Sequence, residues 1–340
     1  MAEPSRLQYT PLPERAQEIV DNLVPPTEGF EEELAKYKHI HPPTPNKEGD
    51  IEIIDDVSFT HHFIDGPGDA EVVKWHYVSA GSPAAEPLVF LHGIPESWFQ
   101  YAHVIAHLSS SFHCIAIDLK GYGQSSTLPG DYTHEGASNQ LYAMLQLLHI
   151  ARFNLVTHDR GTVQGDFLAA NHPSSIIRYI RGEQHLYHYH PSLSPQDALF
   201  RNAPYTGLMA DPTRFVVWVH SFARGPVPIP EKDVARTIQE FSHEGVTRAV
   251  PRYFNSSSFR AEWLERRNRL LEAWTCPALI LQGYDSRTQP REFYEKAREY
   301  IPNAERVEVK YITGGHFWTL ESPKEVAVAI EEFVKGTGKG

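Results

Sequence analysis

Short apolar runs alternate with stretches of helical pattern along most of the chain. The runs are continuous, as expected for strands that are covered on both faces of a sheet. The strands predicted in this way span residues 88–91, 114–117, 154–158, 176–180, 277–281 and 306–312. Helical patterns follow several of them, for example at residues 134–149 and 322–334. This alternation predicts an α/β fold with a mostly parallel, doubly wound sheet.

Two segments interrupt this rhythm. Residues 1–50 are rich in proline, which separates two short predicted helices at residues 13–23 and 28–40. Residues 184–273 contain aromatic and helical patches but no clear apolar strand. We expect the first segment to be an N-terminal extension that packs on the main domain or contributes to an oligomer, such as a homodimer. The second is expected to be a helical lid (cap) insertion.

The remaining residues are predicted to form the core. Residues 51–183 and 274–340 carry the expected strands, so they are assigned to one α/β domain. Residues 51–80 predict two or three further strands, with a turn at Gly66-Pro67-Gly68-Asp69.

Composition narrows the class of protein. Of the 340 residues, 41% are hydrophobic and 22% are charged, which suits a folded chain with a large core. The net charge of −12 argues against nucleic acid or an anionic membrane as the main partner. Cys114 and Cys276 are the only two cysteines and lie in apolar runs, which indicates buried thiols in a reducing compartment. We therefore expect a cytoplasmic protein that acts on a small molecule.

The stretch from Asn154 to Thr162 carries the strongest chemical signal. Its apolar run ends at His158-Asp159-Arg160-Gly161, and a helical pattern follows. This is the layout of a nucleophile elbow, in which a sharp turn between strand and helix exposes the residue at its apex. Asp159 occupies the apex. A carboxylate there can attack carbon and form an ester that water later cleaves.

Five motifs occur in an order that resembles the α/β-hydrolase superfamily, in particular its epoxide hydrolase and dehalogenase branch with an Asp nucleophile. They are His92-Gly93-Ile94-Pro95, Asp118 to Ser125, His158 to Gly161, Gly283-Tyr284-Asp285 and Gly314-Gly315-His316-Phe317. The resemblance covers about residues 50–337 and implies the α/β-hydrolase fold.

The resemblance also implies a catalytic triad. Asp159 would be the nucleophile, and His316 would activate water against the ester. A carboxylate must hold the imidazole in the correct orientation and tautomer. Asp285, just past a predicted strand, is the favoured candidate for this carboxylate. Glu183, which follows the strand ending near Ile180, is the alternative acid.

The first motif resembles an oxyanion-hole loop. The backbone N–H groups of Ile94 and Arg160 would stabilise the oxygen that becomes negative when water attacks the ester. Arg160 also indicates a candidate substrate class. Fluoroacetate dehalogenases have Asp-Arg at this position, and their arginine binds the substrate carboxylate. Such enzymes carry a second arginine four residues after the nucleophile, where this chain has Val163.

The resemblance to epoxide hydrolases also implies a proton donor, because lid tyrosines of those enzymes donate a proton to the ring oxygen. Tyr253 corresponds to one of them. Trp218 falls at or near the place of the other, and His220, Tyr187 or Tyr205 can substitute for it. The remaining residues expected near the pocket are His92, Trp98 and Phe317. Neither a cofactor nor a metal is required.

We therefore predict an epoxide hydrolase-like enzyme that converts an organic epoxide to a diol through an alkyl ester on Asp159. One alternative is a dehalogenase of a short haloacid, with Arg160 on the carboxylate. A second alternative is a non-catalytic protein that binds a small molecule on the same fold.

Overall fold

A nine-stranded sheet forms the centre of the computed structural model, which describes residues 8–14, 17, 29–69 and 72–336. Its strands are β1 (Ile51–Ile54), β2 (Val57–Gly66), β3 (Val73–Ala80), β4 (Pro87–Leu91), β5 (His113–Ile117), β6 (Phe153–His158), β7 (Ile176–Gly182), β8 (Ala278–Gly283) and β9 (Val307–Ile312). Their order in the sheet is β1-β2-β3-β5-β4-β6-β7-β8-β9. The pairs from β5 to β9 are parallel, and the pairs from β1 to β5 are antiparallel. The predicted mostly parallel sheet is thus confirmed.

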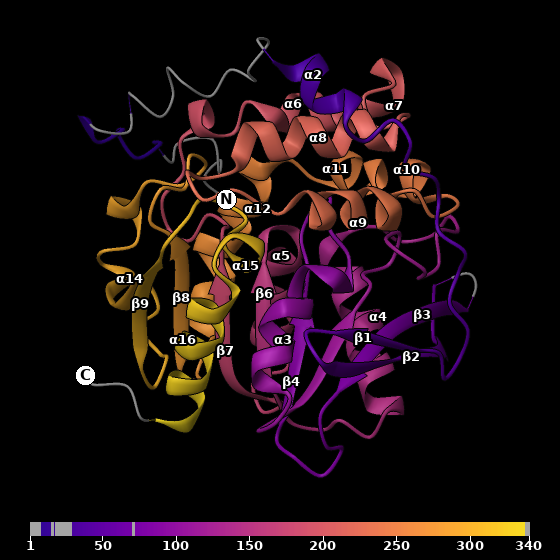
Figure 1. Cartoon of the computed structure of the whole chain (residues 1–340). Helices are drawn as coiled ribbons and strands as arrows, with labels where there is room; N and C mark the ends of the chain where they lie inside the picture. Colours follow the sequence, from indigo (N-terminus) through magenta and orange to yellow (C-terminus); the bar gives the residue numbers. More distant parts are fainter. Residues whose placement is uncertain (1–7, 15–16, 18–28, 70–71, 337–340) are drawn as a thin grey trace.

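Helices cover both faces of the sheet (Figure 1). Helices α4 (His134–Leu147) and α5 (Asp159–Asn171) pack against one face, and α3 (Ala102–Leu108) and α16 (Pro323–Lys335) against the other. The short helices α14 (Ala297–Tyr300) and α15 (Trp318–Glu321) complete this part of the chain, whereas α2 (Phe30–Ala35) packs on α8 (Pro212–Ala223) of the segment between β7 and β8 (Figure 1). Two layers of helices around a parallel sheet bury its continuous apolar strands, which explains their composition.

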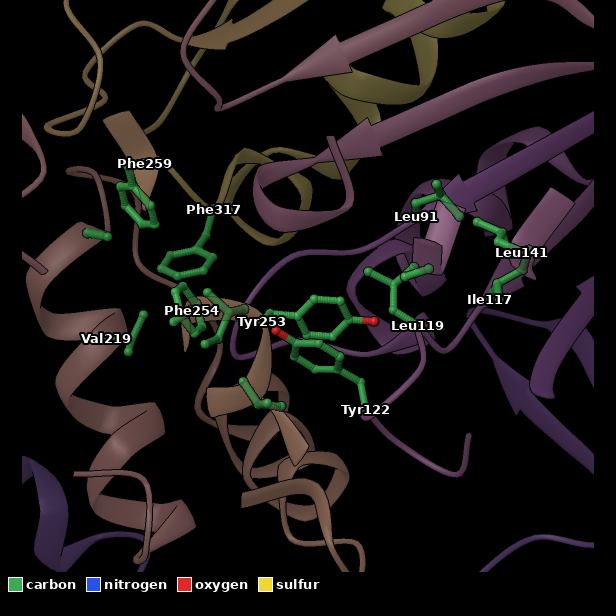
Figure 2. Packing of buried hydrophobic residues seen from close by; sticks show 14 of the residues in the cluster. Leu91, Ile117, Leu119, Tyr122, Leu141, Val219, Tyr253, Phe254, Phe259 and Phe317 are labelled. Atoms are coloured by element: carbon green, nitrogen blue, oxygen red, sulfur yellow. The ribbon is translucent and has the colours of Figure 1, made fainter. Parts of the chain in front are cut away.

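The segment between β7 and β8 is helical and lies above one end of the sheet (top of Figure 1). Its helices are α6 (Gln196–Arg201), α7 (Ala203–Thr206), α8 (Pro212–Ala223), α9 (Glu231–Phe241), α10 (Val246–Ala249), α11 (Pro251–Ser256), α12 (Phe259–Glu265) and α13 (Leu271–Ala273). One hydrophobic cluster joins this segment to the sheet. Figure 2 shows part of it, from Leu91 and Ile117 in the strands to Phe254 and Phe259 in the inserted helices.

The secondary structure agrees closely with the predicted elements. The expected strands and the turn at residues 66–69 are present, with strand ends that differ by at most two residues. The predicted helix at residues 28–40 is shorter and spans Phe30–Ala35. Most of the helix predicted at residues 13–23 lies outside the described residues. The homodimer, the cytoplasmic location and the domain boundaries stay predictions. Within the described parts of the chain, no helix is long and apolar enough to span a bilayer.

Candidate active site

Asp159 lies at a sharp turn, where β6 ends at His158 and α5 begins in the next residue. Its backbone φ is +48°, a left-handed conformation that is uncommon for a residue other than glycine. Such strain occurs often at functional sites, where the surrounding packing holds it. The geometry is that of the predicted nucleophile elbow.

Two glycines allow the neighbouring backbone to approach this turn. A Cβ on Gly161 would lie 2.4 Å from the carbonyl oxygen of His92. A Cβ on Gly93 would lie 2.5 Å from the Cβ of Asp159. Side chains at these two positions would therefore push the loop after β4 away from the elbow. The close approach lets the Ile94 N–H donate to Oδ1 of Asp159 at 2.9 Å.

His316 follows β9 in a glycine loop and is buried beside Asp159. Its Nε2 lies 3.7 Å from Asp159 Oδ2. Its Nδ1 lies 3.0 Å from Glu183 Oε2. The Nε2–H of His158 donates to the backbone carbonyl of His316 at 2.6 Å and helps to fix the loop. The imidazole therefore bridges two carboxylates from different strand ends.

Burial lowers the pKa of His316, but the hydrogen bond and charge of Glu183, together with the charge of Asp159, outweigh it. The net effect is a pKa above the usual 6.5. The site thus stabilises the charged imidazole, because two carboxylates face it.

The expectation that Asp285 orients His316 is corrected by this geometry. Asp285 is exposed, and its backbone N–H donates to the carbonyl of Gly314. Glu183, the alternative acid, instead occupies the position at Nδ1 of His316. The turn after β8 is short, which leaves Asp285 at the surface. Glu183 leaves β7, the strand between β6 and β8, and reaches the imidazole from there.

Glu183 is held by several donors. Its Oε1 accepts from the side chain of Gln282 at 2.7 Å and from the Gly283 N–H at 2.8 Å. Its Oε2 accepts from the Ser286 hydroxyl at 2.8 Å. The side chain is 3% exposed, and its backbone φ is +52°. A buried carboxylate with this many donors is held in one position.

A small cavity of about 40 Å³ lies next to Asp159 and His316. Its walls come from the elbow, from the chain after β7, from the loop after β8 and from the inserted helices. The lining residues are Ile94, Asp159, Arg160, Glu183, Gln184, His185, Ser194, Gln196, Phe200, Trp218, Val219, Phe222, Ala223, Phe259, Thr288, Gln289 and His316. No tyrosine is among these lining residues.

Arg160 lines the cavity, but its charge is already paired. Its Nη1 and Nη2 donate to the two carboxylate oxygens of Glu262 in α12, at 2.9 and 2.6 Å. The guanidinium lies between the rings of Phe254 and Phe259. Burial raises the pKa of Glu262, but Arg160 and His134 outweigh it and hold that pKa well below its usual range. This ion pair connects α5, the helix that begins at Asp159, to the inserted segment.

Glu262→Gln is expected to lower the free energy of unfolding by about 3–5 kcal/mol, because it leaves the buried Arg160 charge without its partner. Urea denaturation measures this loss. Glu265→Gln is the matched control on the same helix, since its ion pair with Arg269 is 44% exposed on both sides. That substitution should lower the free energy of unfolding by less than about 1 kcal/mol. Equal effects of the two substitutions would contradict a stabilising role for the Arg160–Glu262 pair.

The position of Tyr253 contradicts its expected role as proton donor in the pocket. Its hydroxyl donates to the backbone carbonyl of Lys120 at 2.9 Å, away from the cavity lining. The ring packs against Tyr132, His134 and Tyr122, the last of which lies beside it in Figure 2. Burial raises the pKa of its hydroxyl well above the usual value, which further opposes proton transfer.

Among the tentative pocket residues, Trp218 of the inserted helical segment lines the cavity. Three of the other tentative pocket residues make contacts away from the cavity. His92 accepts a hydrogen bond from the Leu119 N–H, His220 pairs with Glu96 at 2.9 Å, and Tyr187 stacks on Tyr300.

Trp98 and Phe317 are also outside the lining. Trp98 packs edge-on against His61, beneath the loop after β4. Phe317 packs against the ring of His316, with 5.0 Å between ring centroids, but does not line the cavity. These two aromatic residues therefore support the site without facing a substrate.

Several lining residues were not singled out from sequence, in particular Gln184, His185, Ser194, Thr288 and Gln289. Gln184 and His185 directly follow Glu183, so their position after a core strand was a usable signal. Ser194, Thr288 and Gln289 lie in irregular segments, and no local pattern marks them. No cluster of three or more His, Cys, Asp or Glu side chains suited to a metal ion occurs within the described ranges.

Comparisons with known proteins agree with this fold. A sequence model for the alpha/beta hydrolase fold matches residues 86–181. The fluoroacetate dehalogenase of a Burkholderia species is 25% identical over 309 residues, which cover 80% of this chain and 94% of that enzyme. Epoxide hydrolase 4 of Mus musculus is 24% identical over 287 residues, or 77% of each chain. The structure of the epoxide hydrolase CorEH superposes with a TM-score of 0.66 at 20% identity, over 82% of this chain and 100% of that one.

The chain therefore has the α/β-hydrolase fold, and the hydrolases that it is similar to include both epoxide hydrolases and dehalogenases.

Proposed function

We propose that this hydrolase opens a small organic epoxide to a diol through an alkyl ester on Asp159. The observation that carries the proposal is the arrangement of Asp159, His316 and Glu183 around one cavity, at 3.7 and 3.0 Å from the imidazole nitrogens. Oδ2 of Asp159 attacks a ring carbon, and the carbon–oxygen bond of the epoxide breaks. His316 then takes a proton from water, which attacks the ester carbonyl.

Ile94 supports the second step. Its N–H already donates to Oδ1 of Asp159, which becomes the carbonyl oxygen of the ester. That oxygen turns negative when water adds, and a donor fixed in advance stabilises it. Arg160 lies in the first turn of α5, where backbone N–H groups have no partner inside the helix, so its N–H is the second proposed donor.

Charge at the cavity favours a neutral substrate. Asp159 and Glu183 are carboxylates, and Glu262 already neutralises Arg160. A substrate carboxylate would meet these negative groups with no free arginine to balance its charge. A neutral epoxide avoids this cost. The cavity of about 40 Å³ is also far below the roughly 150 Å³ that holds benzene, which favours an epoxide of few atoms.

Removal of halide from a short haloacid is the second candidate. The observation that favours it is the cavity lining, which includes Trp218 but no tyrosine. An indole can hydrogen-bond a halide, and halide leaves without a proton. This candidate requires Arg160 to exchange its bond to Glu262 for one to the substrate.

The test uses His316→Gln, which should stop after alkylation. The variant is incubated separately with propylene oxide, fluoroacetate and chloroacetate, and its intact mass is recorded. We expect a gain equal to the whole epoxide, localised by peptide mapping to Asp159. A gain of a carboxymethyl unit would move the enzyme to the dehalogenases. No adduct on Asp159 with any of these probes would overturn covalent catalysis on this class of substrate.

The second step should depend on pH through His316. A protonated imidazole cannot accept a proton from water, so decay of the alkyl-enzyme is expected to slow as the pH falls through the pKa of His316. Glu183 raises that pKa, so the midpoint should lie near or above pH 6.5. Single-turnover decay of the adduct from about pH 5 to 9 measures this. Glu183→Gln should move the midpoint to lower pH, and a rate that is flat over this range would contradict His316 as the base.

A further inference from the structure

The cavity wall contains a chain of hydrogen bonds that the proposed triad does not use. It consists of Gln289, His185 and Ser194, which are 4%, 2% and 5% exposed. All three line the cavity with Asp159 and His316. Ser194 and His185 belong to the segment after β7, and Gln289 to the loop after β8. Two separate parts of the chain therefore converge on this point.

The chemistry of Gln289 sets the direction of the chain. Its Oε1 lies 3.2 Å from the hydroxyl of Tyr294, which can donate to it. Its Nε2 lies 2.9 Å from Nδ1 of His185. An amide nitrogen only donates, so Nδ1 of His185 accepts. The proton of the neutral ring is then on Nε2, which donates to Oγ of Ser194 at 3.0 Å.

His185 stays neutral over the ordinary range of pH. Burial lowers its pKa to about 3, and the charge of Arg266 adds to the effect. The ring therefore has one N–H, and the direction of the chain does not change between about pH 5 and 9. Ser194 is always the acceptor in its bond with His185.

The hydroxyl proton of Ser194 is left free as a result. Its oxygen accepts from His185, and it makes no other hydrogen bond to a described residue. A serine hydroxyl has one proton to donate. Because Ser194 lines the cavity, an acceptor atom of the substrate is the available partner. Tyr253, the donor expected from sequence, does not reach this space.

We propose that Ser194 donates a hydrogen bond to the leaving oxygen of the substrate and that His185 is the positioning residue that orients its hydroxyl. This inference rests on the proposed function. As the bond between Asp159 and carbon forms, the ring carbon–oxygen bond breaks and its electron pair moves to the oxygen. Ser194 stabilises that charge, and the alkoxide takes a proton from solvent water. Hydrolysis of the ester later releases one proton, so the turnover balances.

The experiment measures alkylation alone, in the His316→Gln background with propylene oxide and intact mass as the readout. Adding Ser194→Ala is expected to slow adduct formation about 100-fold, the size seen for donors aimed at developing charge. Ser194→Thr keeps a hydroxyl and should restore most of the rate. Ser192→Ala is the matched control, since Ser192 is exposed two residues away and should leave the rate unchanged.

A change of leaving group separates a donor from a structural role. Allyl bromide loses bromide, which needs much less stabilisation than an alkoxide, so Ser194→Ala should slow its reaction only about 5-fold, the value of one neutral hydrogen bond. A distorted pocket would slow both probes equally and would overturn the proposal. His185→Phe should reproduce the selective loss with the epoxide.

The role of Ser194 and the proposed function can be overturned separately. Equal alkylation rates with and without Ser194→Ala would overturn the role of Ser194 and leave the proposed function intact. No epoxide adduct on Asp159 in His316→Gln itself would overturn the proposed function, and the assignment of Ser194 with it.

Discussion

Asp159→Asn is expected to abolish turnover, with a loss on the order of 10⁴-fold or more, because Glu183, the other carboxylate that lines the cavity, is already bound to His316 and Ser286 and is not free to form the alkyl ester. Asparagine is the sharpest substitution here. It tolerates the φ of +48° at the elbow, and its side-chain oxygen can still accept from the Ile94 N–H. The fold should therefore survive while the negative charge and the nucleophilic oxygen are lost.

Comparison with His316→Gln makes this result specific. Asp159→Asn should form no adduct with propylene oxide, whereas His316→Gln should accumulate one. Intact mass measured over the same incubation compares the two directly. An adduct in Asp159→Asn, or turnover within tenfold of the unaltered chain, would show that a different residue attacks the substrate.

Glu183→Gln is the second large effect that we expect, with a loss on the order of 10³-fold in turnover. The amide can donate to Nδ1 of His316 and so stabilise the wrong tautomer, with the proton on Nε2 where the base must accept it. The carboxylate charge that stabilises the imidazolium is lost as well. Alkylation by propylene oxide should be nearly unchanged, because the imidazole acts only in the second step. The adduct should therefore accumulate in the absence of any change at His316.

Asp285→Asn is the matched control for Glu183. Asp285 follows the next strand and has the same charge, but it is exposed. Its substitution should change turnover by no more than about twofold. A steady-state assay of both variants decides between the two carboxylates. A large loss in Asp285→Asn with little loss in Glu183→Gln would restore the assignment expected from sequence.

The local sequence pattern was sufficient to predict the fold class and two residues of the candidate site, Asp159 and His316. The apolar runs that predicted buried strands form β4 to β9, because a strand covered by helices on both faces must be apolar throughout. Asp159 and His316 were identified from the residues that adjoin them. Asp159 directly follows β6 and His316 lies four residues after the end of β9, so the place of each at the sheet edge depends on a few neighbouring residues.

Contacts between distant segments decided the rest. Glu183 rather than Asp285 reaches His316, because the choice depends on the order of strands in the sheet and on the length of one turn. Tyr253 points to Lys120 because the packing of α11 against Tyr132 and His134 sets its direction.

Sequence alone thus predicted the α/β-hydrolase fold and the two residues, Asp159 and His316, that meet at its candidate site, since these are properties of short segments. Tertiary structure alone decided that Arg160 is neutralised by Glu262, 102 residues away, and that Ser194 meets His185 and Gln289 at the cavity. The physical reason is that the charge and the free donors of a cavity depend on which side chains remain unpaired after folding. Pairing between segments so far apart leaves no periodic or local trace in the chain.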